Sequence, residues 1–156
     1  MTTTAALPRP DRHRDDCLMK CTVTVGRRPS GEIPSPTDGA QVGLLRHKAR
    51  ARLDDRGLAR VADDAVLVVS ELVTNAPVHS GNEEITLSLS LRGGRLRIDV
   101  HDGVRSYQPI PHAVSDEDEH GRGLDLVGAV AEDWRGDWGV SEGGAVTWCE
   151  LDLVTR

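Results

Sequence analysis

The sequence predicts an α+β fold, a two-layer sandwich in which two or three helices cover one side of a mostly antiparallel mixed sheet. Alternating apolar residues over 85–91 and 96–100 flank Gly93-Gly94, which predicts a hairpin with one buried face. Apolar residues spaced three and four apart over 40–53 and 65–76 predict amphipathic helices. With 156 residues, the chain is long enough for one domain with a real core.

The elements are expected to follow one another with short connections, apart from two longer segments. Residues 1–37 are interpreted as a mostly flexible leader with room for an edge strand, and residues 38–156 as the functional domain. Residues 103–119 lack periodicity and form either a flap over a ligand or a plain surface loop. In chain order, the other predicted elements are a strand at Met19–Val25, a helix at Ala40–Leu53 ending before Gly57, a helix from Asp63 or Asp64 to Gly81, the hairpin, a helix at Leu124–Ala131, and strands around Trp134–Val140 and Ala145–Leu153.

Charge narrows the class of partner. The net charge of -6 argues against a protein that binds nucleic acid directly, because such proteins neutralise phosphates with Lys and Arg. Basic residues do gather on the first helix, at Arg46, Lys48 and Arg50, as either a solvated face or a docking place for an acidic protein partner. No apolar stretch approaches the roughly 20 residues that cross a bilayer, so no membrane span is predicted.

The cysteines favour a cytoplasmic location. There are three, an odd number, and no secretory leader precedes them, which points to a reducing compartment rather than a disulfide framework. His13, Cys17 and Cys21 recur at intervals of four, but no fourth ligand at zinc spacing follows them. A zinc site is therefore not predicted. The three tryptophans are expected to lie near one another at the last strands of the sheet.

The second helix carries a carboxylate and a carboxamide four residues apart, at Glu71 and Asn75. Side chains at this spacing leave the same face of a helix. Such a pair can serve a divalent cation and accept a proton, although Glu and Asn on an amphipathic helix are also commonly plain surface residues. The opposite face, which would seat the helix on the sheet, consists of Ala65, Val69, Leu72, Val73 and Ala76.

Two segments downstream carry patterns that bind ligands. Asp102-Gly103 follows an alternating strand, so its carboxylate would lie at the end of that strand. Gly121 and Gly123 are predicted to form a turn that opens the third helix. Glycines allow the backbone to approach a ligand closely, and the helix N-terminus offers free amide hydrogens to phosphate oxygens.

The chain resembles the superfamily that joins gyrase, heat-shock chaperones, histidine kinases and mismatch-repair ATPases. The resemblance lies in three motifs in this order: Glu71-x-x-x-Asn75, Asp102-Gly103 and Gly121-Arg122-Gly123-Leu124. The narrower resemblance is to small bacterial regulators, the anti-sigma factor serine/threonine kinases and their relatives. It also includes His79 and Gly143-Gly144 before Trp148, and it runs from about Asp38 to Leu153. It implies a histidine-kinase-type ATPase fold that binds ATP and Mg²⁺.

The resemblance also implies a role for each matched residue. Glu71 would be the general base, accepting a proton from a Ser or Thr of a partner protein or from water. Asn75 would ligate Mg²⁺ through its amide oxygen. Asp102, with Gly103 beside it, would accept a hydrogen bond from the adenine amine. The phosphates would be bound by Gly121, Gly123 and Leu124. Arg122 either touches the phosphates or only fills the turn. Thr147, on the last strand, would support Asp102.

The chain departs from the family pattern in two places. The usual Asp-x-Gly-x-Gly is Asp102-Gly103-Val104-Arg105-Ser106 here, without the spaced glycines. Pro77 follows Asn75 by two residues, and proline in a helix interior costs about 3 kcal/mol.

Three interpretations follow from this pattern. The leading one is an ATP-binding regulatory protein, a serine/threonine kinase that acts as an anti-sigma-like switch on a protein partner. Homodimers are common among the relatives. The two departures favour the alternative, a non-catalytic module in which nucleotide gates the binding of another protein. A detached histidine-kinase catalytic domain ranks third, because no dimerising helical hairpin with a phosphoacceptor His is recognisable upstream.

Overall fold

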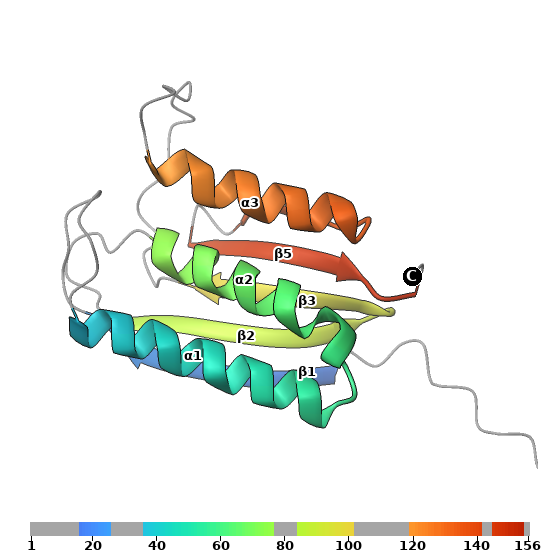
Figure 1. Cartoon of the computed structure of the whole chain (residues 1–156), viewed down its shortest axis with the longest axis horizontal. Helices are drawn as coiled ribbons and strands as arrows, with labels where there is room; N and C mark the ends of the chain where they lie inside the picture. Colours follow the sequence, from blue (N-terminus) through green and yellow to red (C-terminus); the bar gives the residue numbers. More distant parts are fainter. Residues whose placement is uncertain (1–15, 26–35, 77–83, 102–118, 142–144, 155–156) are drawn as a thin grey trace, which may run out of the picture.

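The computed structural model describes residues 16–25, 36–76, 84–101, 119–141 and 145–154. Within these ranges, three helices lie on one face of a five-stranded sheet (Figure 1), which confirms the α+β two-layer fold. In chain order the elements are β1 (Asp16–Thr24), α1 (Pro36–Asp55), α2 (Ala59–Asn75), β2 (Glu84–Arg92), β3 (Arg95–His101), α3 (Glu119–Asp133), β4 (Asp137–Ser141) and β5 (Val146–Asp152).

The strand order is β1-β2-β3-β5-β4, and each of the four neighbouring pairs is antiparallel. β2 and β3 form the predicted hairpin, turned by Gly93 and Gly94 at φ of 56° and 80°. Positive φ at both central residues is typical of a type I′ turn, which suits the twist of a hairpin. β5 lies between β3 and β4, so the last strand of the chain is not at the edge of the sheet.

Alternate residues of the strands face the helices and form the core. α2 contacts the central strands and lies between α1, which contacts β1, and α3, which contacts β4 and β5. The face of α2 that the sequence predicts to be buried is confirmed, and burying each Val or Leu contributes about 1.5–3 kcal/mol. The buried strand residues include Ile85, Leu87, Leu89, Leu96, Ile98, Val100, Cys149 and Leu151.

The start of α2 differs from the prediction. The helix begins at Ala59, one turn before Asp63, and Leu58 at its N-cap makes no side-chain capping bond. Val61 and Ala62 are buried, so the apolar face extends further toward the N-terminus than the sequence analysis assumed. Asp64 therefore lies in the second turn of the helix, where it accepts a hydrogen bond from Trp134 Nε1 at 2.6 Å.

The end of α2 differs as well. The helix ends at Asn75 rather than near Gly81. Ala76 has φ of -57° and ψ of 119°, the extended conformation to which a following proline restricts its neighbour. Pro77 and Gly81 lie outside the described residues. Because the helix already ends before Pro77, the cost of a proline in a helix interior does not arise.

The other element boundaries are close to prediction, with one exception that matters for the site. α1 starts at Pro36 rather than Ala40, and it ends before Gly57 as predicted. β1 starts at Asp16 rather than Met19 and pairs along the edge of the sheet with β2. α3 begins at Glu119, five residues before Leu124. Gly121 and Gly123 therefore lie within the first two turns of α3 and not in a turn that precedes it.

The tryptophans lie near the last strands but do not form one group. Trp134 is buried where α3 connects to β4. Trp138 lies on the helix-facing side of β4, where a Cβ atom on Gly128 of α3 would be 3.2 Å from its Nε1. Trp148 of β5 is on the other face of the sheet, where it contacts Arg97. The prediction that all three lie together is thus wrong, because neighbouring strand positions alternate between faces.

Candidate functional site

Glu71 and Asn75 lie one turn apart on the side of α2 that faces away from the core. Val68, Leu72 and Val73 of the same helix are buried, whereas Glu71 and Asn75 are half-buried. This is the division that the sequence predicts from helical spacing. Asn75 is the last residue of α2, so its side chain lies at the C-terminal end of the helix.

Gly123 of α3 lies against Glu71 and Asn75. A Cβ atom placed on Gly123 would overlap Asn75 Nδ2 and would lie 2.6 Å from Glu71 Oε2. The tips of both α2 side chains therefore converge on one point of the α3 backbone. Glu71 and Asn75 are thus in contact with Gly123, which lies about fifty positions later in the sequence. The sequence analysis assigned all three residues to the site.

The Asn75 carboxamide is buried at its Nδ2 atom, which has no hydrogen-bond partner among the described residues. A buried polar atom without a partner costs about 1–3 kcal/mol, and most such groups in proteins are paired. The nitrogen and oxygen of an Asn side chain exchange places by a 180° rotation of the amide, and which end points inward is an assignment. An amide in this setting is suited to a ligand that completes its coordination, and an amide oxygen suits Mg²⁺.

Thr147 lies on the helix-facing side of the sheet. It is opposite Val100 of β3 and Val140 of β4 in the register. Val100 is the last residue but one of β3, so Thr147 lies beside the end of the strand that leads to Asp102. Asp102 itself is outside the described residues, so the supporting role that the resemblance implies for Thr147 stays a prediction.

The remaining candidates are placed less completely. Leu124 is half-buried and contacts the core. Gly121 and Arg122 belong to the first turn of α3. Asp102, Gly103 and His79 lie outside the described residues, as do most of the residues proposed as a flap (103–118). The structure thus brings Glu71, Asn75 and Gly123 together, and the contact of Asp102 with a base stays a prediction.

Two cysteines that the sequence analysis considered for zinc point away from each other. A bulge lies between Cys17 and Met19 in the pairing of β1 with β2. As a result, Cys17 is opposite Ser90 on the open face, whereas Cys21 is opposite Leu87 and contacts the core. His13 lies outside the described residues. The two thiols are on different faces of the sheet and do not share a site.

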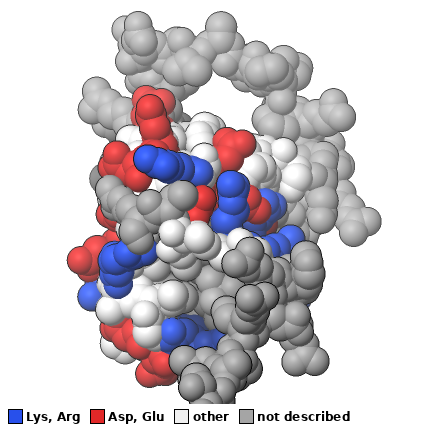
Figure 2. Space-filling model, turned by 90° about the vertical axis from the view of Figure 1, so that its right-hand side faces the viewer, with Lys and Arg blue, Asp and Glu red and all other residues white. Residues whose placement is uncertain are grey.

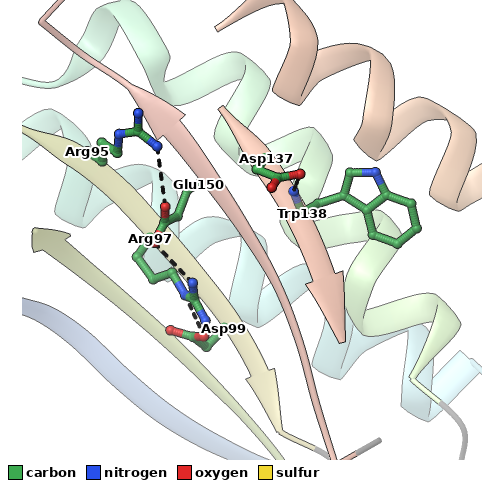
Figure 3. A network of polar contacts seen from close by, with 6 residues as sticks. All are labelled: Arg95, Arg97, Asp99, Asp137, Trp138 and Glu150. Atoms are coloured by element: carbon green, nitrogen blue, oxygen red, sulfur yellow. Dashed lines mark hydrogen bonds and ion pairs between the residues drawn. The ribbon is translucent and has the colours of Figure 1, made fainter. Parts of the chain in front are cut away.

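The open face of the sheet carries a charged cluster that the sequence analysis missed (Figure 3). Arg97 donates from Nε to Asp99 at 2.9 Å and from Nη1 to Glu150 at 3.0 Å, and its guanidinium lies 4.1 Å from the centre of the Trp148 ring. Arg95 adds a longer contact of 3.6 Å to Glu150. Polar residues at alternate strand positions are expected on any exposed sheet face, so nothing in the sequence marked these as neighbours.

The side of the molecule drawn in Figure 2 carries charges of both signs. Figure 2 shows one side of the molecule on which Lys and Arg lie beside Asp and Glu, with no large area of a single sign. On α1, Arg50 bonds both Asp54 and Asp63. In the part of the chain that the structure describes, no helix is both long and apolar enough to cross a lipid bilayer.

Comparison with known proteins places the chain in a family. The model of the histidine kinase-like ATPase domain matches residues 35–149, from just before α1 into β5. A search of curated proteins finds no match. The matched range includes Glu71, Asn75 and Gly123 and covers most of the chain. The chain therefore belongs to the histidine kinase-like ATPase domain family, and this membership implies that it binds ATP.

Proposed function

We propose that this ATP-binding regulatory protein is a Mg²⁺-dependent serine/threonine kinase that acts on a protein partner, in the manner of the anti-sigma factor kinases it resembles. The observation that carries the proposal is the convergence of Glu71 and Asn75 on Gly123, with the buried Nδ2 atom of Asn75 lacking a hydrogen-bond partner among the described residues. A carboxylate beside an amide at the junction of two helices combines a proton acceptor with a metal ligand. Family membership supplies the nucleotide.

The residues divide the chemistry as follows. The Glu71 carboxylate accepts the proton of the attacking Ser or Thr hydroxyl. The Asn75 amide oxygen ligates Mg²⁺, which neutralises charge on the phosphates when it is bound. Asp102 and Gly103 recognise the adenine, and Thr147 supports them from β5. Gly121, Arg122, Gly123 and Leu124 serve the phosphates at the first turns of α3.

The end of α2 favours the kinase over the non-catalytic alternative. The main objection to catalysis was that Pro77 would distort the helix around Asn75. Asn75 is the last helical residue, and Ala76 donates its backbone N–H to the Val73 carbonyl at 3.3 Å, so the helix closes before Pro77. The sequence after Asp102 still departs from the usual family pattern, and this departure supports the alternative of a nucleotide-gated binding module.

The partner is proposed to be a protein antagonist or a sigma factor that meets the chain in the cytoplasm, where it could also form a homodimer. α1 offers one docking place, because Arg46 and Lys48 are exposed on it. Arg50 is already engaged by Asp54 and Asp63, so it contributes less to such a surface than its charge suggests.

Calorimetry with ATP, in the presence and absence of Mg²⁺, tests the proposal. We expect Mg²⁺ to increase the affinity for ATP, and we expect Glu71→Ala to keep that affinity. Transfer of labelled phosphate to a Ser or Thr of candidate partners should fall by at least about 100-fold in Glu71→Ala, since a general base typically contributes this much. Binding of ATP without any transfer, in wild type and variant alike, would instead support the non-catalytic module.

A further inference from the structure

Gly123 occupies a position where no side chain fits. It is buried in the second turn of α3, against Asn75 and Glu71 of α2. Both atoms that a Cβ atom would strike are tips of side chains, Asn75 Nδ2 and Glu71 Oε2. A methyl group could therefore be accommodated only if the carboxamide and the carboxylate turned away or the two helices separated.

The backbone of Gly123 does not itself require glycine. Among the described residues, the glycines with positive φ are Gly57, Gly93 and Gly94, and Gly123 is not one of them. In an ordinary helical conformation, alanine is a better helix former than glycine. The glycine at this position is thus explained by the space that the α2 side chains need, and not by a dihedral angle.

We propose that Gly123 is a positioning residue for the Glu71–Asn75 pair. Its missing side chain lets the α3 backbone form the wall against which the carboxylate and the carboxamide are held. This inference rests on the proposed function. It is separate from the backbone contact with phosphate that the family resemblance implies, because it acts through side chains of another helix.

The test measures the dissociation constant for ATP in EDTA and in Mg²⁺. The constant in EDTA divided by the constant in Mg²⁺, here called the magnesium ratio, reports how much the metal strengthens binding. We expect Gly123→Ala to lower this ratio about tenfold, toward the value of Asn75→Ala, while the EDTA constant changes less than about threefold. In an Asn75→Ala background, Gly123→Ala should change the ratio less than about twofold, because the group that it acts through is gone.

Gly128→Ala is the matched control. It makes the same substitution one to two turns later in α3, where the three atoms nearest to the new methyl belong to Trp138, with Nε1 at 3.2 Å, and not to Glu71 or Asn75. It should leave the magnesium ratio unchanged. An unchanged ratio in Gly123→Ala would overturn the positioning role, and an equal loss with Mg²⁺ and with EDTA would show direct contact with nucleotide in its place.

Thermal unfolding covers the case in which Gly123→Ala folds poorly. Removal of the Asn75 amide should then restore the Tm toward that of Asn75→Ala alone, and a double variant that stays as unstable as Gly123→Ala contradicts the inference. If the wild type shows no Mg²⁺-dependent binding of ATP, the proposed function fails first and this role falls with it. A failure of the inference alone leaves wild-type binding intact.

Discussion

On the open face of the sheet, Arg97 is held between Asp99 and Glu150 and lies over Trp148. In the helix layer, by contrast, the buried Nδ2 atom of Asn75 has no hydrogen-bond partner among the described residues. Both regions are partly buried; the Arg97 side chain is 16% exposed. In the first region, opposite charges satisfy one another. In the second, no described residue satisfies the polar atom.

This difference separates a structural role from a ligand-binding role. A polar cluster that completes its own hydrogen bonds stabilises the fold and needs no ligand. An unpaired buried polar atom is a cost that a protein keeps when binding repays it. Substitutions in the two regions should therefore move stability and affinity in opposite ways, which the following experiments test.

Arg97→Ala should lower stability more than any other substitution in the charged cluster of the open face. It leaves the half-buried carboxylates of Asp99 and Glu150 without their central cation, and bonds of this charged kind contribute about 1.5–3 kcal/mol. We expect the free energy of unfolding in urea to fall by about 2 kcal/mol, with the affinity for ATP within about twofold of wild type.

Arg95→Ala is the control for that loss. The Arg95 side chain is 45% exposed and makes a long ion pair with Glu150 at 3.6 Å, so its removal should cost less than about 0.5 kcal/mol. Equal losses in the two variants, or a large loss of ATP affinity in Arg97→Ala, would mean that the open face is not the self-contained structural cluster described above.

The sequence predicted the layers of this fold better than the contacts within the site. Helical spacing in α2 predicted which side chains are buried, and Gly93-Gly94 predicted the hairpin, because both patterns are local. Spacing contains no information on which strands become neighbours, so the place of β5 between β3 and β4 could not be predicted. Asp63 or Asp64 was expected to start α2, but the buried Val61 and Ala62 extend the helix back toward Ala59, and Asp64 instead bonds Trp134 from inside it.

The candidate site shows the same limit. Glu71 and Asn75 were identified from their spacing in one helix, and Gly123 from its resemblance to a phosphate-binding turn. The structure instead places Gly123 inside a helix and against the pair. That contact joins segments about fifty residues apart, and it depends on how closely α2 and α3 approach, which no local pattern specifies.

A titration to alkaline pH compares the two faces of β5, because Cys149 lies on its helix-covered face and Glu150 on its open face. Burial raises the pKa of the Cys149 thiol from 9.0 to about 12, and the neighbouring Glu150 carboxylate adds to the rise. Between these values the unfolded chain loses the thiol proton while the folded chain keeps it. Stability is therefore fully present below about pH 9 and falls above it, by at most about 1.4 kcal/mol per pH unit.

Urea unfolding at about pH 8 and about pH 10 measures this term. Cys149→Ala should lose less stability over the interval than wild type, by about 1 kcal/mol. Cys17→Ala is the matched control, because its thiol is exposed on the open face, and it should follow wild type. If Cys149→Ala and wild type decline in parallel, the helix-covered side of β5 is not as dry as its burial indicates.

Asn75→Ala should cost little or no stability and is the most direct test of the contrast between the two regions. The substitution removes a side chain whose buried Nδ2 atom has no hydrogen-bond partner among the described residues, and it places a better helix former at the end of α2. Without nucleotide, the free energy of unfolding should stay within about 0.5 kcal/mol of wild type or rise by up to about 1 kcal/mol, although the Mg²⁺-dependent part of ATP binding is lost.

Val73→Ala, two residues earlier on the same helix, provides the opposite result for comparison. Val73 is 1% exposed in the core, so its truncation should cost about 1–3 kcal/mol and should leave the magnesium ratio close to wild type. If Asn75→Ala destabilised the protein as much as Val73→Ala does, the amide would be part of the fold's own hydrogen-bonding network. Neutral stability with a lost metal response is the combination that distinguishes a residue kept for binding from one kept for folding.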